Sequence, residues 1–568
     1  MAAPPSAPKH LSPKINPHVV VTGAFGALPV SADKGQLQAE GEGHAGTATA
    51  LLLVTALAVV LRVVALDSTF WIDEIATLNT MRNVPLWDVL MNYTGGVNNH
   101  LLNTVLVRMT IRVFGEQEWS ARLPAVLFGI AIVPALYWLG RSGSRPMLSR
   151  RSATLVALLA AASYHLIWFS QNARGYTSYL FFSLLATGAL ARSLAGGGRR
   201  WCGLFVVATV LNLASLIVAS FVFVAHLIVT AVAYPRSRSA RNRITLSVPA
   251  AVATFSAAGL LSAVVYAPIF YKVVAGVNKL YGRPASGFKP LSLDFLAEMF
   301  RGISLGFAGL LFAGALPFLI LGIIGFIRLV RRNWIVPVSL ALSQLLLGMV
   351  IVSRSWTISP RFLVLALPLA ILVFVEGCDA LAAATAGAFR RYVVARGHGT
   401  RTAREIVNVQ GLTQRLAGVF VLLAVAGSLA SLPHYYRTPK MPYVAAIYAL
   451  DQIARPTDLI VAAYMVAPGF KYYLPKVSGV RRHAFTSTRS REGLDSIVAA
   501  NPGRRVLVAT TLPRLFSVEQ PTLYARIRSG WTRVQVLPAT LGDGEITLWA
   551  PVGDSLADGR PPNTPNNH

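Results

Sequence analysis

Long apolar stretches separated by short polar segments recur from residue 46 to residue 432 of this 568-residue chain. Most approach the roughly 20 residues that an α-helix needs to cross the hydrocarbon core of a bilayer. The pattern therefore predicts an all-α polytopic membrane protein with eleven crossings. These are expected at residues 46–66, 121–140, 152–169, 175–195, 201–215, 217–234, 245–270, 304–327, 334–352, 361–378 and 416–432. The pair 201–215 and 217–234 could instead be one long kinked element.

Basic residues gather in the polar segments between alternate apolar stretches. Five alternate loops together hold 20 Arg, and loops rich in Arg stay on the cytoplasmic side of a membrane. This placement predicts a cytoplasmic N-terminus and, with an odd number of crossings, an extracytoplasmic C-terminus. Cys202 and Cys378 then fall at cytoplasmic ends of their spans, so no disulfide is expected.

The apolar segment 99–115 does not fit this alternation. It is only about 15 residues long, shorter than an ordinary span, and it carries Arg108 and Arg112 four positions apart. Counting it as a span would move every later Arg cluster to the outside. We therefore expect an amphipathic helix on the outer interface, with a short true span as the alternative.

The two ends of the chain differ in composition from the apolar middle. Residues 1–45 are rich in Pro, Gly and Ala, and they are predicted to be a disordered cytoplasmic tail before a transmembrane domain at 46–436. Helix and strand patterns then alternate, which predicts a small extracytoplasmic α/β domain at 437–555. Residues 556–568 are expected to be a disordered end. The α/β domain has no motif of known chemistry, so its expected role is acceptor binding or a cap.

The overall composition narrows the function classes. Charged residues make up 13% of the chain, apolar residues 54%, and the mean hydropathy is +0.54. Soluble domains carry about 25% charged residues, which argues against a cytosolic enzyme and against a disordered protein. The net charge of +29 comes largely from the short clusters between spans, so it reflects membrane topology and gives no reason to expect a nucleic acid partner.

Two adjacent carboxylates, Asp73 and Glu74, follow the first predicted span on its outer side. Acidic residues are scarce in this chain, with only 23 in total. A carboxylate held near an acceptor hydroxyl can act as a general base. The alternative is an acidic pair that favours the dipole at a helix N-terminus.

Cations are also predicted on the outer side, where positive charge is normally disfavoured. An anionic phosphate group is one reason for their presence, since Arg and Lys are its usual partners. The alternatives are snorkelling of an arginine, a loop neutralised by lipid, and simple membrane anchoring. The candidate phosphate ligands are Arg174, Lys272, Lys279, Arg283 and Arg361.

The order of several motifs resembles that of the GT-C membrane glycosyltransferases. The motifs are Trp71-Ile72-Asp73-Glu74, Asn98-Asn99-His100-Leu101-Leu102, Arg122-Leu123-Pro124-Ala125, Ser170-Gln171-Asn172-Ala173-Arg174-Gly175-Tyr176 and Ser359-Pro360-Arg361-Phe362. The resemblance runs from about residue 46 to residue 550. It is nearest to a bacterial branch with lipopolysaccharide-core galacturonosyltransferases and protein mannosyltransferase-like enzymes. The segment at Asn98 departs from the family in lacking its usual prolines.

This resemblance implies a polyprenyl-phosphate sugar donor and inverting transfer to a hydroxyl of an envelope glycan, lipid or protein. The reaction would take place on the outer face of the bacterial plasma membrane. Asp73 would be the general base and Glu74 would orient it or bind the acceptor, while the cations named above would bind the donor phosphate. Some relatives use a divalent cation, but no cofactor and no metal are expected here. The candidates for sugar or acceptor hydroxyls are His100, Gln171, Tyr176 and Tyr281.

Two other function classes stay open on the sequence. A transporter or flippase of a lipid-linked glycan would place ionisable residues near the membrane midplane and show repeat symmetry. Here the unusual charges lie at the outer ends of spans, and no repeat is visible. A scaffold whose external domain binds cell-wall glycan would leave the pair Asp73 and Glu74 unexplained.

Overall fold

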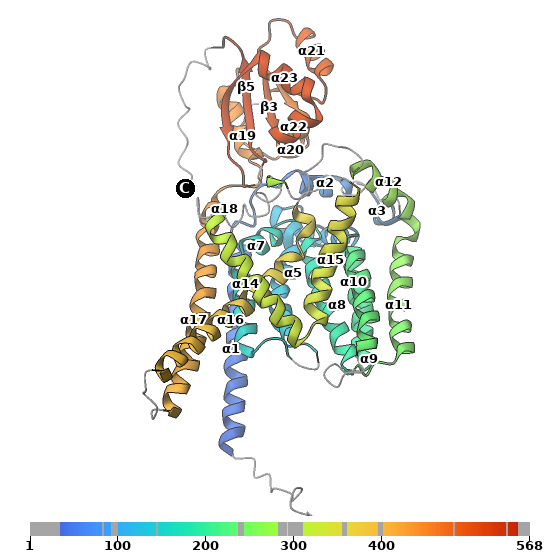
Figure 1. The fold of residues 1–568 in the computed structure, drawn as a ribbon. Coiled ribbons are helices and arrows are strands. Elements are labelled where there is room, and N and C mark those ends of the chain that lie inside the picture. Colours follow the sequence, from blue (N-terminus) through green and yellow to red (C-terminus); the bar gives the residue numbers. More distant parts are fainter. Residues whose placement is uncertain are drawn as a thin grey trace, which may run out of the picture. The chain divides into compact units, whose positions relative to one another are not determined.

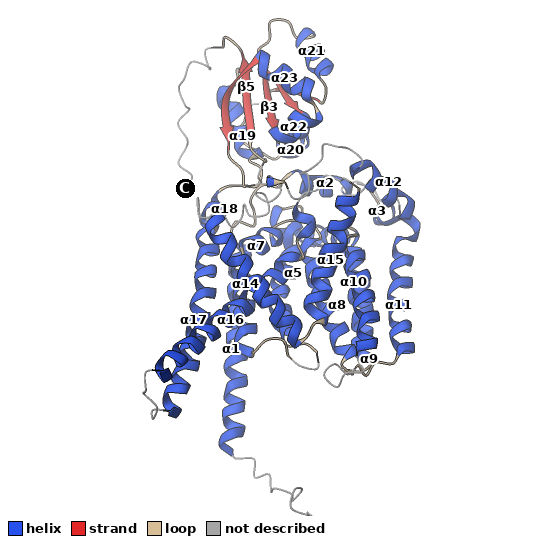
Figure 2. Cartoon of the chain, viewed as in Figure 1, coloured by secondary structure: helices blue, strands red, loops and turns tan. Residues whose placement is uncertain are grey.

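The computed structural model describes residues 34–81, 84–91, 100–143, 146–236, 244–281, 292–293, 311–354, 360–395, 402–480, 483–540 and 543–554. Within these ranges, the chain is helical as far as α19 (Tyr443–Ile453), and the five described strands all come after it (Figure 2). The change of architecture near residue 440 agrees with the change of composition there. The protein therefore combines an α-helical membrane part with a small C-terminal α/β part, as predicted.

The helices of the first part are labelled in Figure 1. They are α1 (Lys34–Val63), α2 (Ile72–Met81), α3 (Leu86–Met91), α4 (Leu101–Phe114), α5 (Glu118–Gly140), α6 (Arg150–Ala162), α7 (Tyr164–Ser170), α8 (Tyr176–Leu194), α9 (Arg199–Ser215), α10 (Ala219–Arg236), α11 (Val248–Tyr266), α12 (Phe270–Tyr281), α14 (Leu311–Arg332), α15 (Ile335–Ser353), α16 (Ala366–Ala395), α17 (Thr402–Ala430) and α18 (Leu432–Arg437). Helix α1 begins inside the segment predicted as a tail; residues 1–33 and 555–568 lie outside the described residues.

Seven helical segments among the described residues are long and apolar enough to cross a membrane. They are Gly46–Val63, Glu118–Gly140, Ala219–Arg236, Val248–Gly276, Ile335–Ser353, Ala366–Phe389 and Gly411–Arg437. An eighth is counted if α6 and α7, which meet at a bend of 57°, form one broken span. The prediction of a multi-pass membrane protein agrees with this count, whereas the number eleven stays a prediction.

The helix boundaries resolve one ambiguity of the sequence and locate the helix of the other. Segments 201–215 and 217–234 form two separate helices, α9 and α10. The awkward segment 99–115 forms α4, which has 14 residues and buries Leu101, Asn103, Thr104 and Val107. A helix on the interface and a short span packed on its neighbours would each bury one face, so the position of α4 relative to the membrane stays a prediction.

Small residues let the apolar helices approach closely. Helices α5, α8 and α9 pack against one another, and α14 packs on α16 (Figure 1). A Cβ atom at Gly325 would lie 1.9 Å from the Val373 carbonyl oxygen, and one at Gly377 would lie 2.1 Å from that of Leu321. These two glycines therefore permit backbone contact between α14 and α16, which is how many membrane helices associate.

The C-terminal part is a five-stranded mixed sheet in the order β2-β1-β3-β5-β4. Strands β1, β2 and β3 are parallel, while β5 is antiparallel to both β3 and β4. The strands are β1 (Leu459–Ala463), β2 (Ala484–Thr488), β3 (Val506–Thr511), β4 (Trp531–Leu537) and β5 (Ile546–Pro551).

Helices cover both faces of this sheet. Ile460 and Ala462 pack with α19 and α20 (Ala467–Tyr473). Val461 and Val508 pack with α21 (Arg491–Ala499), α22 (Pro513–Glu519) and α23 (Pro521–Gly530) on the opposite face. Strand β1 is buried throughout, as expected of a parallel strand covered on both sides.

The loop that follows α1 is held by the C-terminal part of the chain. The Thr69 hydroxyl donates to the Met441 carbonyl at 2.7 Å, and the Phe70 amide donates to the Tyr473 hydroxyl at 2.7 Å. The Tyr473 hydroxyl in turn donates to Glu118 at 2.8 Å. The start of α2 is thus fixed by residues about 370 to 400 positions later in the chain.

Candidate active site

The two predicted carboxylates lie in the first turn of α2, where a helix dipole favours negative charge. Consecutive residues of an α-helix point about 100° apart, so Asp73 and Glu74 face different surroundings. The side chain of Glu74 has no exposed surface, whereas that of Asp73 is 21% exposed. Only Asp73 is therefore open to a reactant.

Glu74 is enclosed by donors. Arg122 Nε lies 2.9 Å from Glu74 Oε1 and Arg122 Nη2 lies 2.8 Å from Oε2, which makes a bidentate pair. The Ala173 amide donates to Oε1 at 2.8 Å. Arg122 also donates to the carbonyls of Leu66 at 2.7 Å and Ser68 at 2.6 Å, so it fixes the loop before α2. This pair is a structural clasp, and we call it the Glu74–Arg122 clasp.

Lys440 lies beside the clasp and is almost fully buried. Its ammonium group donates to the Gln171 carbonyl and lies 4.7 Å from the centre of the Trp168 ring. Burial lowers the pKa of Lys440 to about 7; Arg122 acts in the same direction and Glu74 opposes it. Burial raises the pKa of Glu74, but Arg122 and Lys440 bring it below its ordinary value. The clasp thus stays ionised at neutral pH.

Asp73 lies between two arginines from distant parts of the chain. Arg361 Nη1 is 3.0 Å from Asp73 Oδ2, and Arg174 Nη1 is 3.9 Å from the same oxygen. The side chain of Arg361 is 29% exposed and lies 5.4 Å from the centre of the Trp71 ring, whereas that of Arg174 is 5% exposed. The structure therefore brings together three of the predicted site residues at a partly open place.

His100 contacts Arg174 and helps to hold its guanidinium group in this cluster. Its Nε2 lies 3.0 Å from Arg174 Nη2, and its Nδ1 accepts from the Gly175 amide at 3.1 Å. Burial, with Arg174 and Arg361, lowers the pKa of His100 well below its usual range, so the ring is neutral at pH 7. A Cβ atom at Gly175 would lie 2.4 Å from the Ser215 carbonyl oxygen. Glycine is therefore required where His100 meets the residue after Arg174.

The other two predicted hydroxyl ligands near this cluster are inside the protein. The Gln171 amide donates to the carbonyls of Arg62 at 2.9 Å and Val64 at 2.7 Å, so it caps the end of α1. The Tyr176 ring is buried with its centre 5.7 Å from that of the His100 ring. Its hydroxyl has no hydrogen-bond partner within the described part of the chain.

The remaining predicted site residues are Lys272, Lys279, Tyr281 and Arg283, which lie in α12 or shortly after it in the sequence. Lys272 lies on α12 with its ammonium 5.8 Å from the centre of the Tyr271 ring. The side chains of Lys279 and Tyr281, and the whole of Arg283, lie outside the described residues. The roles of these four residues stay predictions.

Sequence reasoning gave no role to two residues of this site, Arg122 and Lys440. Arg122 lies in a motif that the family resemblance quotes, but its partner is 48 positions earlier. Lys440 lies between the two domains, where no local pattern marks it. Among the described residues, no group of three or more His, Cys, Asp and Glu side chains could hold a metal ion.

No protein-family model matches the chain, and no curated protein matches it in sequence. The chain is similar to the crystal structure of ArnT from Cupriavidus metallidurans bound to undecaprenyl phosphate, with 14% identity and a TM-score of 0.49, over 90% of this chain and 99% of that one. It is also similar to the oligosaccharyltransferase AglB from Archaeoglobus fulgidus in complex with an inhibitory peptide and a dolichol-phosphate. There the identity is 11% and the TM-score 0.45, over 86% of this chain and 73% of that one. At these identities and TM-scores the two likenesses assign neither a family to this chain nor a role to any of its residues.

Proposed function

We propose that this protein is a membrane glycosyltransferase that moves a sugar from a polyprenyl-phosphate donor to a hydroxyl group. The acceptor would be an envelope glycan, lipid or protein at the outer face of the bacterial plasma membrane. One observation carries this proposal: the partly exposed carboxylate of Asp73 lies between Arg174 and Arg361 next to a set of apolar helices. A base and two cations at one place suit a reaction that removes a proton and releases a phosphate.

The arrangement suggests how the donor would engage the site. A phosphate has several strong acceptor oxygens, and the forked guanidinium group of Arg can bind two of them at once. A donor phosphate would therefore compete with Asp73 for Arg174 and Arg361. As the two guanidinium groups turn to the phosphate, the carboxylate becomes available to the acceptor hydroxyl.

The proposed step is a single displacement. The acceptor oxygen attacks the anomeric carbon on the face opposite the phosphate, its proton passes to Asp73, and the bond from carbon to phosphate oxygen breaks. The electron pair leaves with the polyprenyl phosphate, whose growing negative charge Arg174 and Arg361 stabilise. The two guanidinium groups supply the positive charge, so the step is written without a metal ion. One displacement inverts the configuration of the anomeric carbon.

The test compares Asp73→Asn with wild type, both purified and reconstituted in nanodiscs. Each is incubated with a panel of radiolabelled polyprenyl-phosphate sugars and a crude envelope acceptor, and the release of polyprenyl phosphate is measured. Loss of a general base is expected to lower the rate by about 10²-fold to 10⁴-fold. Asp67→Asn is the matched control, because Asp67 is an exposed carboxylate in the same loop.

Each contrary outcome removes a defined part of the proposal. Full transfer by Asp73→Asn would remove Asp73 as the base. No release from any donor by wild type, with lipid-linked glycan carried across a proteoliposome membrane, would replace the transferase with a flippase. Equal loss in Asp67→Asn would mean that the loop tolerates no change of charge, and Asp73 would lose its special role.

A further inference from the structure

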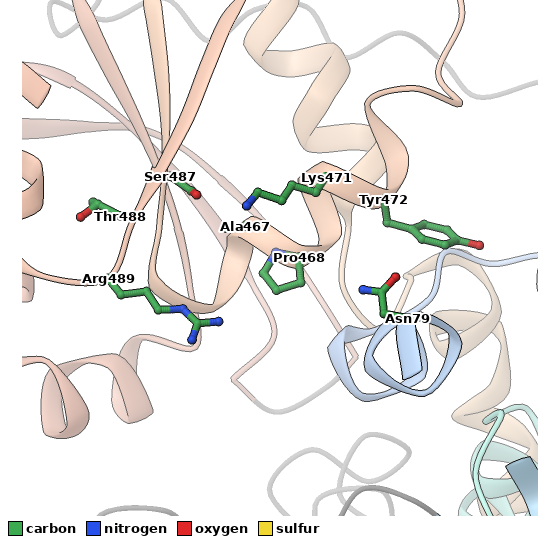
Figure 3. A pocket seen from close by; sticks show the side chains of 8 residues that line it. All are labelled: Asn79, Ala467, Pro468, Lys471, Tyr472, Ser487, Thr488 and Arg489. Atoms are coloured by element: carbon green, nitrogen blue, oxygen red, sulfur yellow. The ribbon is translucent and has the colours of Figure 1, made fainter. Parts of the chain in front are cut away.

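A cavity of about 570 Å³ lies between α2 and the C-terminal sheet (Figure 3). Its lining comes from three separate elements: α2, α20 and the end of β2. None of its lining residues belongs to the cluster around Asp73. The cavity is thus separate from the cluster around Asp73. It lies where the C-terminal part of the chain meets α2, the helix that carries the two carboxylates.

The cavity opens at the carboxyl ends of parallel strands. Strands β1 and β2 pair in parallel, with Ala463 opposite Thr488 at their last position. Ser487 and Thr488 line the cavity from β2, and Ala467 lines it from the helix that follows β1. In sheets with parallel strands, ligands characteristically bind in the crevice beyond these carboxyl ends. The topology therefore marks this edge as a place for a ligand.

Two cations are directed at the cavity from different elements. Lys471 comes from α20 and Arg489 follows β2, and both side chains are exposed. In Figure 3 the two side chains extend into the same space on either side of Ala467 and Pro468. Neither cation forms an ion pair with a carboxylate of the described residues, although several other cations of this domain do. Two cations that share one hollow, and that form no ion pair with a described carboxylate, are suited to an anion.

Neutral polar groups accompany the two cations. The Ser487 hydroxyl and the Asn79 amide line the cavity, and neither makes a side-chain hydrogen bond within the described part of the chain. The Thr488 hydroxyl, in contrast, is used in the turn to α21, where it donates to the Ser490 carbonyl at 3.0 Å. Ala467 and Pro468 add an apolar patch to the lining. A saccharide presents the matching surface, since its rings have hydroxyl edges and C–H faces.

The charge of the whole domain favours the same kind of ligand. Residues 437–555 contain 15 Lys and Arg against eight Asp and Glu. A surface with one prevailing sign of charge raises the local concentration of ligands of the opposite sign. An anionic ligand would therefore be drawn to this domain before it reaches the cavity.

Helix α2 connects the cavity to the site. Asn79 lines the cavity and Asp73 begins the same helix, six residues earlier, which corresponds to about 9 Å along the helix axis. We propose that the cavity binds an anionic glycan, a saccharide chain that carries carboxylate or phosphate groups, and holds it as the acceptor. Its role as acceptor rests on the proposed function, whereas the binding itself does not.

The test measures binding in the absence of any donor. The full chain in nanodiscs is titrated with three labelled tetrasaccharides: tetragalacturonate, maltotetraose carrying one phosphate, and unmodified maltotetraose. The variant Lys471→Gln/Arg489→Gln is expected to bind the anionic probes at least about tenfold more weakly, which corresponds to about 1.4 kcal/mol. The anionic probe that binds wild type more tightly identifies the charged group.

The control variant is Arg528→Gln/Arg533→Gln. It removes the same charge from the same domain, but Arg533 lies on β4, at the opposite edge of the sheet from β2. Its affinity for the anionic probes is expected to equal that of wild type. Equal weakening in the two variants would reduce the effect to overall charge and overturn the site. Equally tight binding of unmodified maltotetraose, or no binding of either anionic probe at millimolar concentration, would overturn it as well.

The acceptor role is then tested separately from the proposed reaction. Asp73→Asn is expected to bind the anionic probes as wild type does, because Asp73 does not line the cavity. If wild type shows no transfer while the probes still bind, the proposed function fails and the binding site stands. If wild type transfers sugar, Lys471→Gln/Arg489→Gln should raise the acceptor KM and leave kcat unchanged. An unchanged KM would remove the acceptor role.

Discussion

The two neighbouring carboxylates at the N-terminus of α2 differ in burial and in pairing. On the closed side, Glu74 is out of contact with solvent and is bonded to Arg122 through both oxygens. On the open side, Asp73 shares one oxygen between Arg361 and Arg174 and keeps a fifth of its surface exposed. Both sides use arginine, so the type of partner does not separate them. The two carboxylates differ in exposure and in pairing: Glu74 is buried with both oxygens bonded, whereas Asp73 is partly exposed, which is why Asp73 is the one proposed to react.

The largest expected effect is on the closed side. Glu74→Gln leaves Arg122 buried without its counter-charge, and removing one partner of a buried pair costs about 3–5 kcal/mol. We expect a loss of this size in the free energy of unfolding, measured by denaturant titration in detergent. Asp73→Asn should stay within about 1 kcal/mol of wild type, because its pairs are partly exposed. Equal losses in the two variants would erase the difference between the sides.

Substitutions on the open side are expected to lower the rate of transfer and to leave the stability of the fold unchanged. Arg361→Gln removes one of the two cations proposed for the donor phosphate, and we expect transfer to fall about 10²-fold. The melting temperature should be unchanged. Arg354→Gln is the matched control, since Arg354 is an exposed arginine at the end of α15, seven positions earlier. An activity loss shared by both variants would point to the charge of the loop and not to a phosphate ligand.

The effect that is smallest per step concerns pH, because it builds up gradually over several pH units, and it again belongs to the closed side. Lys440 has a pKa of about 7 in the folded chain and an ordinary value of 10.5. Between these two values the unfolded chain binds more protons, so stability rises with pH, by up to about 1.4 kcal/mol per unit. Below pH 7 this contribution no longer changes, because both forms are protonated. Lys440→Met should flatten the rise of the melting temperature between pH 7 and pH 9.5, and an equal slope in both proteins would contradict the lowered pKa.

The open side of the site was within reach of sequence reasoning. Asp73, Arg174 and Arg361 stand out because they are charges at the ends of apolar stretches that are predicted to face outward, where charge is expensive. The division of labour between Asp73 and Glu74 was not predictable in this way. It depends on Arg122 and Ala173, whose contacts with Glu74 cross 48 and 99 positions of the chain. Tertiary packing, and not the local pattern, decides which neighbour is buried.

Prediction of the fold from the sequence meets the same limit, because local patterns reveal buried strands but not edge strands. Continuous apolar runs predict strands at residues 458–464 and 505–510, and the buried strands β1 and β3 lie within one residue of these positions. Strand β2 (Ala484–Thr488) is not predicted, because it is an edge strand of mixed composition with mostly intermediate burial. This missing strand carries two residues of the cavity, Ser487 and Thr488. The capping contacts of Gln171 were not predicted either, because its Nε2 group donates to carbonyls more than 100 positions earlier in the chain.

The hydrogen bonds from Thr69 and Phe70 to Met441 and Tyr473 have a consequence for biosynthesis. The two carboxylates are synthesised well before the residues that hold their loop, which come about 370 to 400 positions later. The loop therefore gains these bonds only when the C-terminal part has been made and folded. Until then the growing chain carries both carboxylates on a loop without these bonds. Assembly of the candidate site thus waits for synthesis to pass Tyr473.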